Sequence, residues 1–121
     1  MIIRESAEMY METILVLSKK GSVRSIDIAK AMNFSRPSVS VTIHNLEKEK
    51  YLVISEEGLI SLTEKGLKIA ETIYERHTVI SKLLESIGVP AEIAAADACK
   101  IEHDISIETF DCIKKKLGNL C

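Results

Sequence analysis

The sequence contains no tryptophan and only two prolines and five glycines among its 121 residues. Because proline and glycine interrupt helices, their scarcity favours a mainly helical chain. No apolar run is long enough to cross a membrane and no signal peptide is visible, so we expect a cytoplasmic protein without a membrane partner. The odd number of cysteines (Cys99, Cys112 and Cys121) excludes complete disulfide pairing and indicates free thiols.

The sequence also lacks the basic excess that is usual in nucleic-acid-binding proteins, because its net charge is -2. Basic and acidic side chains balance up to Lys65, and the acidic excess lies in the second half. The charge distribution therefore leaves room for a DNA-binding first half. Carboxylates in the second half could bind a cation.

Three helices are predicted in the first half from the helical spacing of apolar side chains. They cover residues 4–19, a short stretch capped by Ser25, and residues 35–48. Pro37 suits the first turn of the third helix, where its missing N–H costs no hydrogen bond. The third helix should direct Val39, Ile43 and Leu46 toward the core.

A hairpin is predicted next, with strands at residues 52–55 and 59–62 and a turn at residues 56–58. Two short helices followed by a hairpin describe a winged helix-turn-helix, whose second helix enters the DNA major groove. We therefore place a DNA-binding domain at residues 1–62. The alternative is a helical domain with an incidental hairpin.

The second half, residues 63–121, should form a helical domain. Thr63 opens a long helix to about residue 87, a further helix covers residues 90–103, and Ser106 caps the last one. Their apolar faces are wider than a small winged domain requires, which indicates a two-fold dimer. The alternative is that these helices only pack on one another.

Three potential metal ligands, Cys99, Glu102 and His103, have the spacing i, i+3, i+4. This spacing places them on one face of a helix. Thiolate, carboxylate and imidazole together suit a divalent transition metal rather than calcium or magnesium. The alternative is a buried cysteine beside an exposed glutamate and histidine.

With these elements, three motifs resemble the diphtheria toxin repressor and manganese transport regulator family of metal-dependent bacterial transcription factors. The motifs are residues 7–10 (AEMY), residues 76–77 (RH) and residues 97–103 (DACKIEH), and the resemblance runs nearly end to end. It implies a homodimeric, metal-dependent repressor of metal-homeostasis genes that binds double-stranded operator DNA. It also implies no enzymatic activity and no small-molecule substrate.

The resemblance assigns a regulatory metal site. In the iron-responsive branch, the matching positions are Met9, Cys99, Glu102 and His103, and His77 matches a ligand position in both branches. A metal held there would join the helix that supports the DNA-binding half to the dimer half. We therefore expect the metal to order the dimer for operator binding.

Other positions resemble the manganese-responsive branch or neither branch. Glu12 matches a carboxylate of the manganese branch, whereas Ser81 and Ala95 replace two ancillary ligands of the iron branch. The soft donors Met9 and Cys99 favour Fe(II), with Co(II), Ni(II) or Zn(II) possible in vitro. Mn(II) is the second choice. It stays open because the iron branch usually has a third, SH3-like domain, which is missing here.

The outer side of the third helix should contact DNA phosphates, base edges and thymine methyl groups. Base readout should be sparse, since Val41 stands where the iron branch has glutamine. The expected contact residues are Ser35, Arg36, Pro37, Ser38, Ser40, Val41, Thr42 and His44.

Two functions from other classes stay open. One is a metal-independent winged-helix module that senses thiol oxidation through Cys99 or binds a protein partner. The other, a metal-dependent hydrolase that uses Glu102 and His103, is weaker because no additional general base or substrate pocket can be named.

Overall fold

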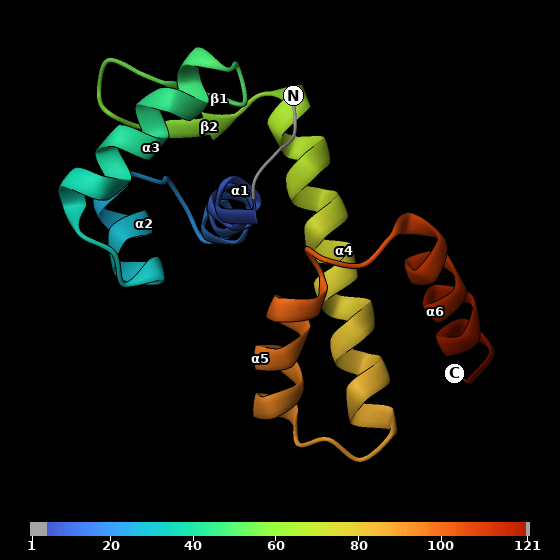
Figure 1. The fold of residues 1–121 in the computed structure, drawn as a ribbon. Helices are drawn as coiled ribbons and strands as arrows, with labels where there is room; N and C mark the ends of the chain where they lie inside the picture. The colour runs from blue at the N-terminus through green and yellow to red at the C-terminus, as the bar shows by residue number, and fades with distance from the viewer. Residues whose placement is uncertain (1–4, 121) are drawn as a thin grey trace. The chain divides into compact units, whose positions relative to one another are not determined.

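The computed structural model of the protein describes residues 5–120, so Arg4 and Cys121 lie outside the described residues. Within that range the chain is mainly helical, with one two-stranded sheet (Figure 1). The elements are α1 (Glu5–Ser18), α2 (Ser25–Met32), α3 (Arg36–Lys48), β1 (Leu52–Ile54), β2 (Ile60–Leu62), α4 (Glu64–Ser86), α5 (Ala91–Ile101) and α6 (Ile107–Leu120). They form two compact units, residues 1–71 and 72–121, which divide within α4.

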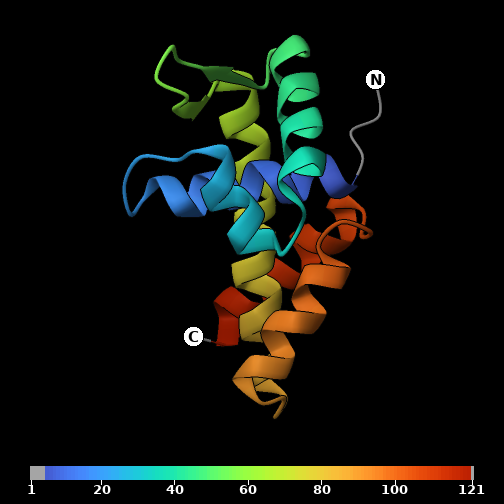
Figure 2. The ribbon, with the colours of Figure 1, turned by 90° about the vertical axis from the view of Figure 1, so that its left-hand side faces the viewer.

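The first unit is a winged helix-turn-helix, as predicted. Buried side chains of α1, α2, α3 and the hairpin share one hydrophobic core, to which α3 contributes Val39, Ile43 and Leu46. Ser35 caps α3, because its Oγ accepts a hydrogen bond from the Ser38 N–H at 3.3 Å. The side of α3 that faces away from this core is thus left for other contacts (Figure 2).

The start of α2 differs from the prediction. Ser25 is the first residue of α2, and the N-cap position belongs to Arg24. The carboxylate of Asp27 accepts the Arg24 backbone N–H at 2.9 Å, so an acidic side chain in the first turn holds this helix end. The serine hydroxyl expected there as a cap is not needed.

The hairpin, or wing, pairs Leu52 with Leu62 and Ile54 with Ile60 in antiparallel register. It is held to the helices in two ways: the Ile60 N–H donates to the Val23 carbonyl at 2.8 Å, and the Arg24 guanidinium donates to the Glu57 carbonyl. Gly58 has φ 82, a value that glycine adopts without strain, and this allows the tight turn.

The wing tip carries two exposed acidic side chains, Glu56 and Glu57. The pKa of Glu57 is lowered, chiefly by a backbone hydrogen bond, with further contributions from Ser55 and the charge of Arg24. The tip therefore stays negatively charged throughout the neutral pH range.

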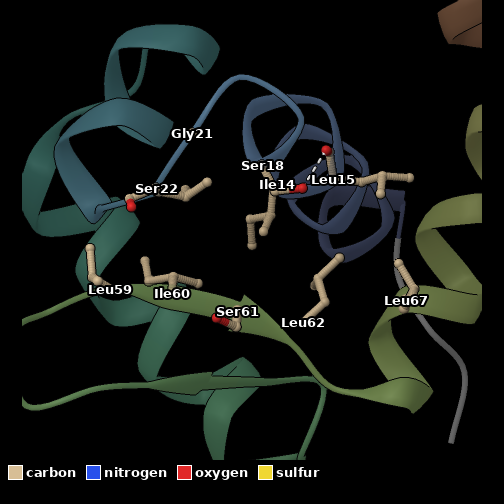
Figure 3. A pocket seen from close by; sticks show the side chains of 11 residues that line it. Ile14, Leu15, Ser18, Gly21, Ser22, Leu59, Ile60, Ser61, Leu62 and Leu67 are labelled. Atoms are coloured by element: carbon tan, nitrogen blue, oxygen red, sulfur yellow. Dashed lines mark hydrogen bonds between the residues drawn. The ribbon is translucent and has the colours of Figure 1, made fainter.

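A pocket of about 320 Å³ lies in the first unit between α1, β2 and the start of α4 (Figure 3). Its wall is mostly aliphatic, and its polar side chains are serines, one of which, Ser18, donates to the Leu15 carbonyl at 2.7 Å. No titratable or metal-ligating side chain lines this pocket, so it is unsuited to metal or acid–base chemistry.

In the second unit, α5 and α6 pack beside the C-terminal part of α4 (Figure 1). Ser106 caps α6, as predicted, by accepting the Thr109 N–H at 3.1 Å. The helix predicted for residues 90–103 is shorter than expected, because α5 ends at Ile101 and Glu102 is its C-cap. Among residues 5–120, no helix has the length and hydropathy that crossing a bilayer requires.

Candidate metal centre and DNA-facing surface

His77 on α4 lies against the end of α5. Its Nδ1 is 3.0 Å from Oε2 of Glu102 and 3.7 Å from Sγ of Cys99. One ligand atom from each of these three residues lies within 4.8 Å of the other two. The fold thus brings His77 to two residues that lie 22 and 25 positions later in the chain.

Cys99 takes part because it occupies the last turn of α5, three residues before the helix C-cap. Its side chain is exposed, and His77 is 25% exposed, so the cluster can be reached from solvent. Cys112, by contrast, is an exposed thiol on α6 outside this cluster. It remains an ordinary thiol in our interpretation.

Glu102 is completely buried although it is ionisable. Its second oxygen, Oε1, lies 3.3 Å from Nε2 of His103, whose side chain is only 1% exposed. Burial of a carboxylate is costly unless cationic or hydrogen-bonding groups face it, and here one imidazole faces each oxygen. Of these two contacts, the one with His77 is a hydrogen bond, and it orients the carboxylate.

The donor set fits a divalent transition metal. The ligand atoms of a thiol, a carboxylate and an imidazole lie within 4.8 Å of one another, and a second imidazole lies 3.3 Å from the same carboxylate. The His77 Nδ1–H donates to the carboxylate in the arrangement described, since a carboxylate oxygen can only accept. Ligation through Nδ1 would therefore require the other imidazole tautomer, and ligation by the Cys99 thiol would release its proton.

Met9 and Glu12 lie three residues apart on α1, in the first unit, and both are half-buried. Their membership of the metal site stays a prediction. Ser81 is half-buried on α4, with an Oγ that has no hydrogen-bond partner among the described residues, and Ala95 supplies no ligand atom.

The predicted DNA-contact residues lie along α3 and at its N-cap, and six of the eight are exposed. Ser40 and Thr42 are half-buried, whereas Val41 is 63% exposed. The exposed six are Ser35, Arg36, Pro37, Ser38, Val41 and His44.

Three of these polar side chains, those of Ser35, Ser38 and His44, already make hydrogen bonds within the helix or at its cap. The Ser35 hydroxyl lies 2.8 Å from the Ser38 hydroxyl, in addition to its capping role. The His44 Nδ1–H donates to the Ser40 carbonyl at 2.7 Å, which leaves Nε2 as the outward ring nitrogen. Neutral His44 can therefore only accept a hydrogen bond at Nε2, and contact with a phosphate requires the protonated ring.

Two family models match the chain. The model for the N-terminal DNA-binding domain of iron-dependent repressors matches residues 3–59, and the model for their metal-binding and dimerisation domain matches residues 63–120. An HTH-type transcriptional regulator, MntR of Geobacillus kaustophilus, is 37% identical over 109 residues, which are 89% of this chain and 77% of that protein. The chain therefore belongs to the iron-dependent repressor family, whose members are metal-dependent transcriptional regulators.

Solved structures are similar to the chain as well. IdeR of T. acidophilum is 28% identical with a TM-score of 0.77, and the match covers 98% of this chain and 55% of that chain. The manganese regulator SloR is 26% identical with a TM-score of 0.81, and the covered shares are again 98% and 55%. The chain thus spans about half the length of these two solved relatives.

Proposed function

We propose that this regulator represses metal-homeostasis genes, and that a divalent metal bound by His77, Cys99, Glu102 and His103 makes it bind its operator. The observation that carries the proposal is the convergence of His77, Cys99 and Glu102 on one point, with the Glu102 carboxylate fully buried. When bound, the metal would supply the positive charge that compensates the thiolate and the carboxylates. Met9 and Glu12 would complete the site from α1.

The proposed roles of the two domains follow the sequence boundary. Residues 1–62 would bind double-stranded operator DNA through α3, and residues 63–121 would bind metal and form a homodimer. The limits of the matched family models, 59 and 63, support this boundary. Exposed apolar side chains in the second half, Ile87, Ile93 and Ile107, support the homodimer.

The regulatory effect would arise from ligands on both domains. Without metal, Glu12, Glu102 and a Cys99 thiolate repel one another, and the two domains sample many orientations. A metal that joins the two domains would select the orientations in which a dimer places both copies of α3 in successive major grooves. A coupling free energy of about 1–3 kcal/mol would change operator occupancy usefully.

Fe(II) is the metal we propose first, because Cys99 and Met9 are soft donors. Mn(II) is the alternative, and the similarity to MntR and to the manganese regulator SloR favours it. Operator binding by the reduced, anaerobic protein, measured at increasing free concentrations of each metal, would decide between them, with Co(II), Ni(II) and Zn(II) as comparisons, because affinity alone follows the Irving–Williams order. Activation at a lower free concentration of Mn(II) than of Fe(II) would overturn the first choice.

Electrophoretic shift of upstream genomic DNA tests the proposed function. We expect a shift with Fe(II) or Mn(II) that is lost on chelation. A shift that is independent of metal, or no shift with any fragment, would contradict the proposal. Because the family consists of transcriptional regulators of operator DNA, we also propose a cytoplasmic location, no enzymatic activity and no small-molecule substrate.

Thiol sensing is a second candidate that one observation favours. Cys99 is exposed, and its Sγ lies 3.7 Å from an imidazole nitrogen, an arrangement that can promote thiol reactivity. If metal-free protein responds to peroxide in DNA binding, and Cys99→Ser abolishes the response, thiol sensing is supported. A response that persists in Cys99→Ser excludes it.

A further inference from the structure

Arg76, the residue before His77 on α4, contacts the chain just beyond α5. Its Nη1 donates to the backbone carbonyl of Glu102 at 3.1 Å and to that of Ile105, also at 3.1 Å. The guanidinium carbon lies 5.5 Å from the centroid of the Phe110 ring on α6. One side chain thus contacts both ends of the segment 102–105 and the helix that follows it.

Segment 102–105 offers backbone carbonyl groups to which a guanidinium can donate hydrogen bonds. The last carbonyls of a helix accept no hydrogen bond within the helix, and they carry a partial negative charge. Glu102 is the C-cap of α5, and Ile105 precedes the start of α6. Arg76 satisfies a carbonyl at each place, and its positive charge complements the C-terminus of α5.

Adjacent residues of α4 therefore hold the same glutamate in two ways. Arg76 fixes the backbone of Glu102, and His77 contacts its carboxylate. His103 follows directly in the same segment, with its Nε2 near the other carboxylate oxygen. A shift of the segment would displace both residues together.

One N–H group of the Arg76 side chain is in an unfavourable environment. Its Nε is buried and has no hydrogen-bond partner among the described residues. A buried N–H without a partner is unfavourable, so the contacts of the rest of the guanidinium must outweigh that loss. Both carbonyl contacts come from Nη1, so the ammonium group of lysine could reproduce them in part, without the contact of a planar guanidinium with the Phe110 ring.

We propose that Arg76 is a positioning residue for the metal centre: it holds segment 102–105 so that Glu102 and His103 are oriented before metal binds. The inference rests on the proposed function, since it assumes that these two residues are ligands. Residues that orient metal ligands typically change metal affinity by roughly 10- to 100-fold when they are replaced. Loss of Arg76 should have an effect of that size.

The test uses Co(II) as the probe, with the full-length reduced protein and two variants, Arg76→Met and Arg76→Lys. A cobalt–thiolate absorption band reports Cys99 ligation, and titration of the band gives the Co(II) affinity. Thermal unfolding of the metal-free proteins reports stability separately. Lys114→Met is the matched control, because Lys114 Nζ also joins α6 to α4, through Glu75 at 3.0 Å, without contacting segment 102–105.

We expect Arg76→Met to lose roughly 10- to 100-fold in Co(II) affinity and to show a changed band, with a smaller loss in Arg76→Lys. Lys114→Met should match the wild type. If the Arg76 variants only unfold at lower temperature and keep the wild-type band and affinity, Arg76 is a structural contact and the inference is wrong. Should Arg76→Met not fold, Arg76→Lys decides by the same criteria. A wild type without any cobalt–thiolate band would instead contradict the proposed function.

Discussion

Replacement of the buried carboxylate, Glu102→Gln, should separate metal binding from folding. The amide keeps the volume of the side chain and removes its charge. Because Glu102 has no exposed surface and its Oε2 accepts from His77 Nδ1, the amide oxygen of glutamine can keep that hydrogen bond. Metal-free Glu102→Gln should therefore equal or exceed the wild type in stability, within about 1 kcal/mol, since a buried charge is removed.

With metal present, the wild type should be the more stable of the two proteins. At a free metal concentration of about 100 times Kd, binding stabilises the wild type by about 2.7 kcal/mol. For a chain of this size, that corresponds to a rise in Tm of roughly 10 °C.

Loss of one ligand should remove most of this effect. If a binding free energy of about 12 kcal/mol is shared by six ligands, losing one costs about 2 kcal/mol, or roughly 30-fold in affinity. The metal-induced stabilisation then falls to about 0.9 kcal/mol at the same concentration, which is a rise in Tm of only about 4 °C.

Thermal unfolding by circular dichroism, with and without metal, measures both effects. Glu75→Gln is the control, because this exposed carboxylate on α4 pairs with Lys114 and lies outside the cluster. A surface pair contributes about 0–1 kcal/mol, so the control should keep the full metal-induced rise. If Glu102→Gln keeps the wild-type rise in Tm, Glu102 is not a ligand and the reasoning is refuted.

Three further predictions concern the first unit. Ser35→Ala should lower the free energy of unfolding in urea by about 1 kcal/mol through loss of the α3 cap, whereas Ser35→Asp should keep the cap and weaken DNA binding; equal stability of all three proteins would contradict the capping role. Glu56→Gln combined with Glu57→Gln should strengthen operator binding a few-fold at low salt and little at high salt, measured by fluorescence anisotropy, because the wing tip would no longer repel phosphates. Weaker binding of that double variant would refute the prediction. Gly66→Ala should cost about 1–3 kcal/mol in urea unfolding, since its Cβ would clash with the Tyr51 carbonyl, and an unchanged midpoint would show that the backbone yields there.

Much of the fold could be predicted because its signals are local. Ser35 and Ser106 are hydroxyl caps that accept N–H groups three residues ahead, and α3 and α6 begin where the sequence indicates. The wing is recognisable from two short apolar runs around a turn with glycine. Such signals depend only on neighbours within one helical turn or one hairpin.

Two helix ends were wrongly predicted because other groups satisfy them. At the start of α2, the Asp27 carboxylate accepts the Arg24 N–H, so Ser25 is not the cap. At the end of α5, the carbonyl of Glu102 is satisfied by Arg76, 26 residues earlier in the chain. A partner that distant leaves no pattern around the helix end itself.

The candidate metal centre was only partly predictable from spacing. The i, i+3, i+4 pattern found Cys99, Glu102 and His103, but it placed all three on one helical face, whereas α5 ends before Glu102. His77 entered through the resemblance alone, because only folding brings α4 to within 3.0 Å of Glu102. Arg76 belonged to one of the motifs of the resemblance but was assigned no role, because its carbonyl partners lie 26 and 29 positions later in the chain.

The central claim is that metal binding and operator binding are coupled, and calorimetric titration tests it most directly. Metal affinity is measured for the same anaerobic protein with and without its operator duplex. Since coupling is reciprocal, operator DNA should tighten metal binding by the same factor by which metal tightens DNA binding, roughly 5- to 150-fold. Equal metal affinity in the presence and absence of operator would contradict the account.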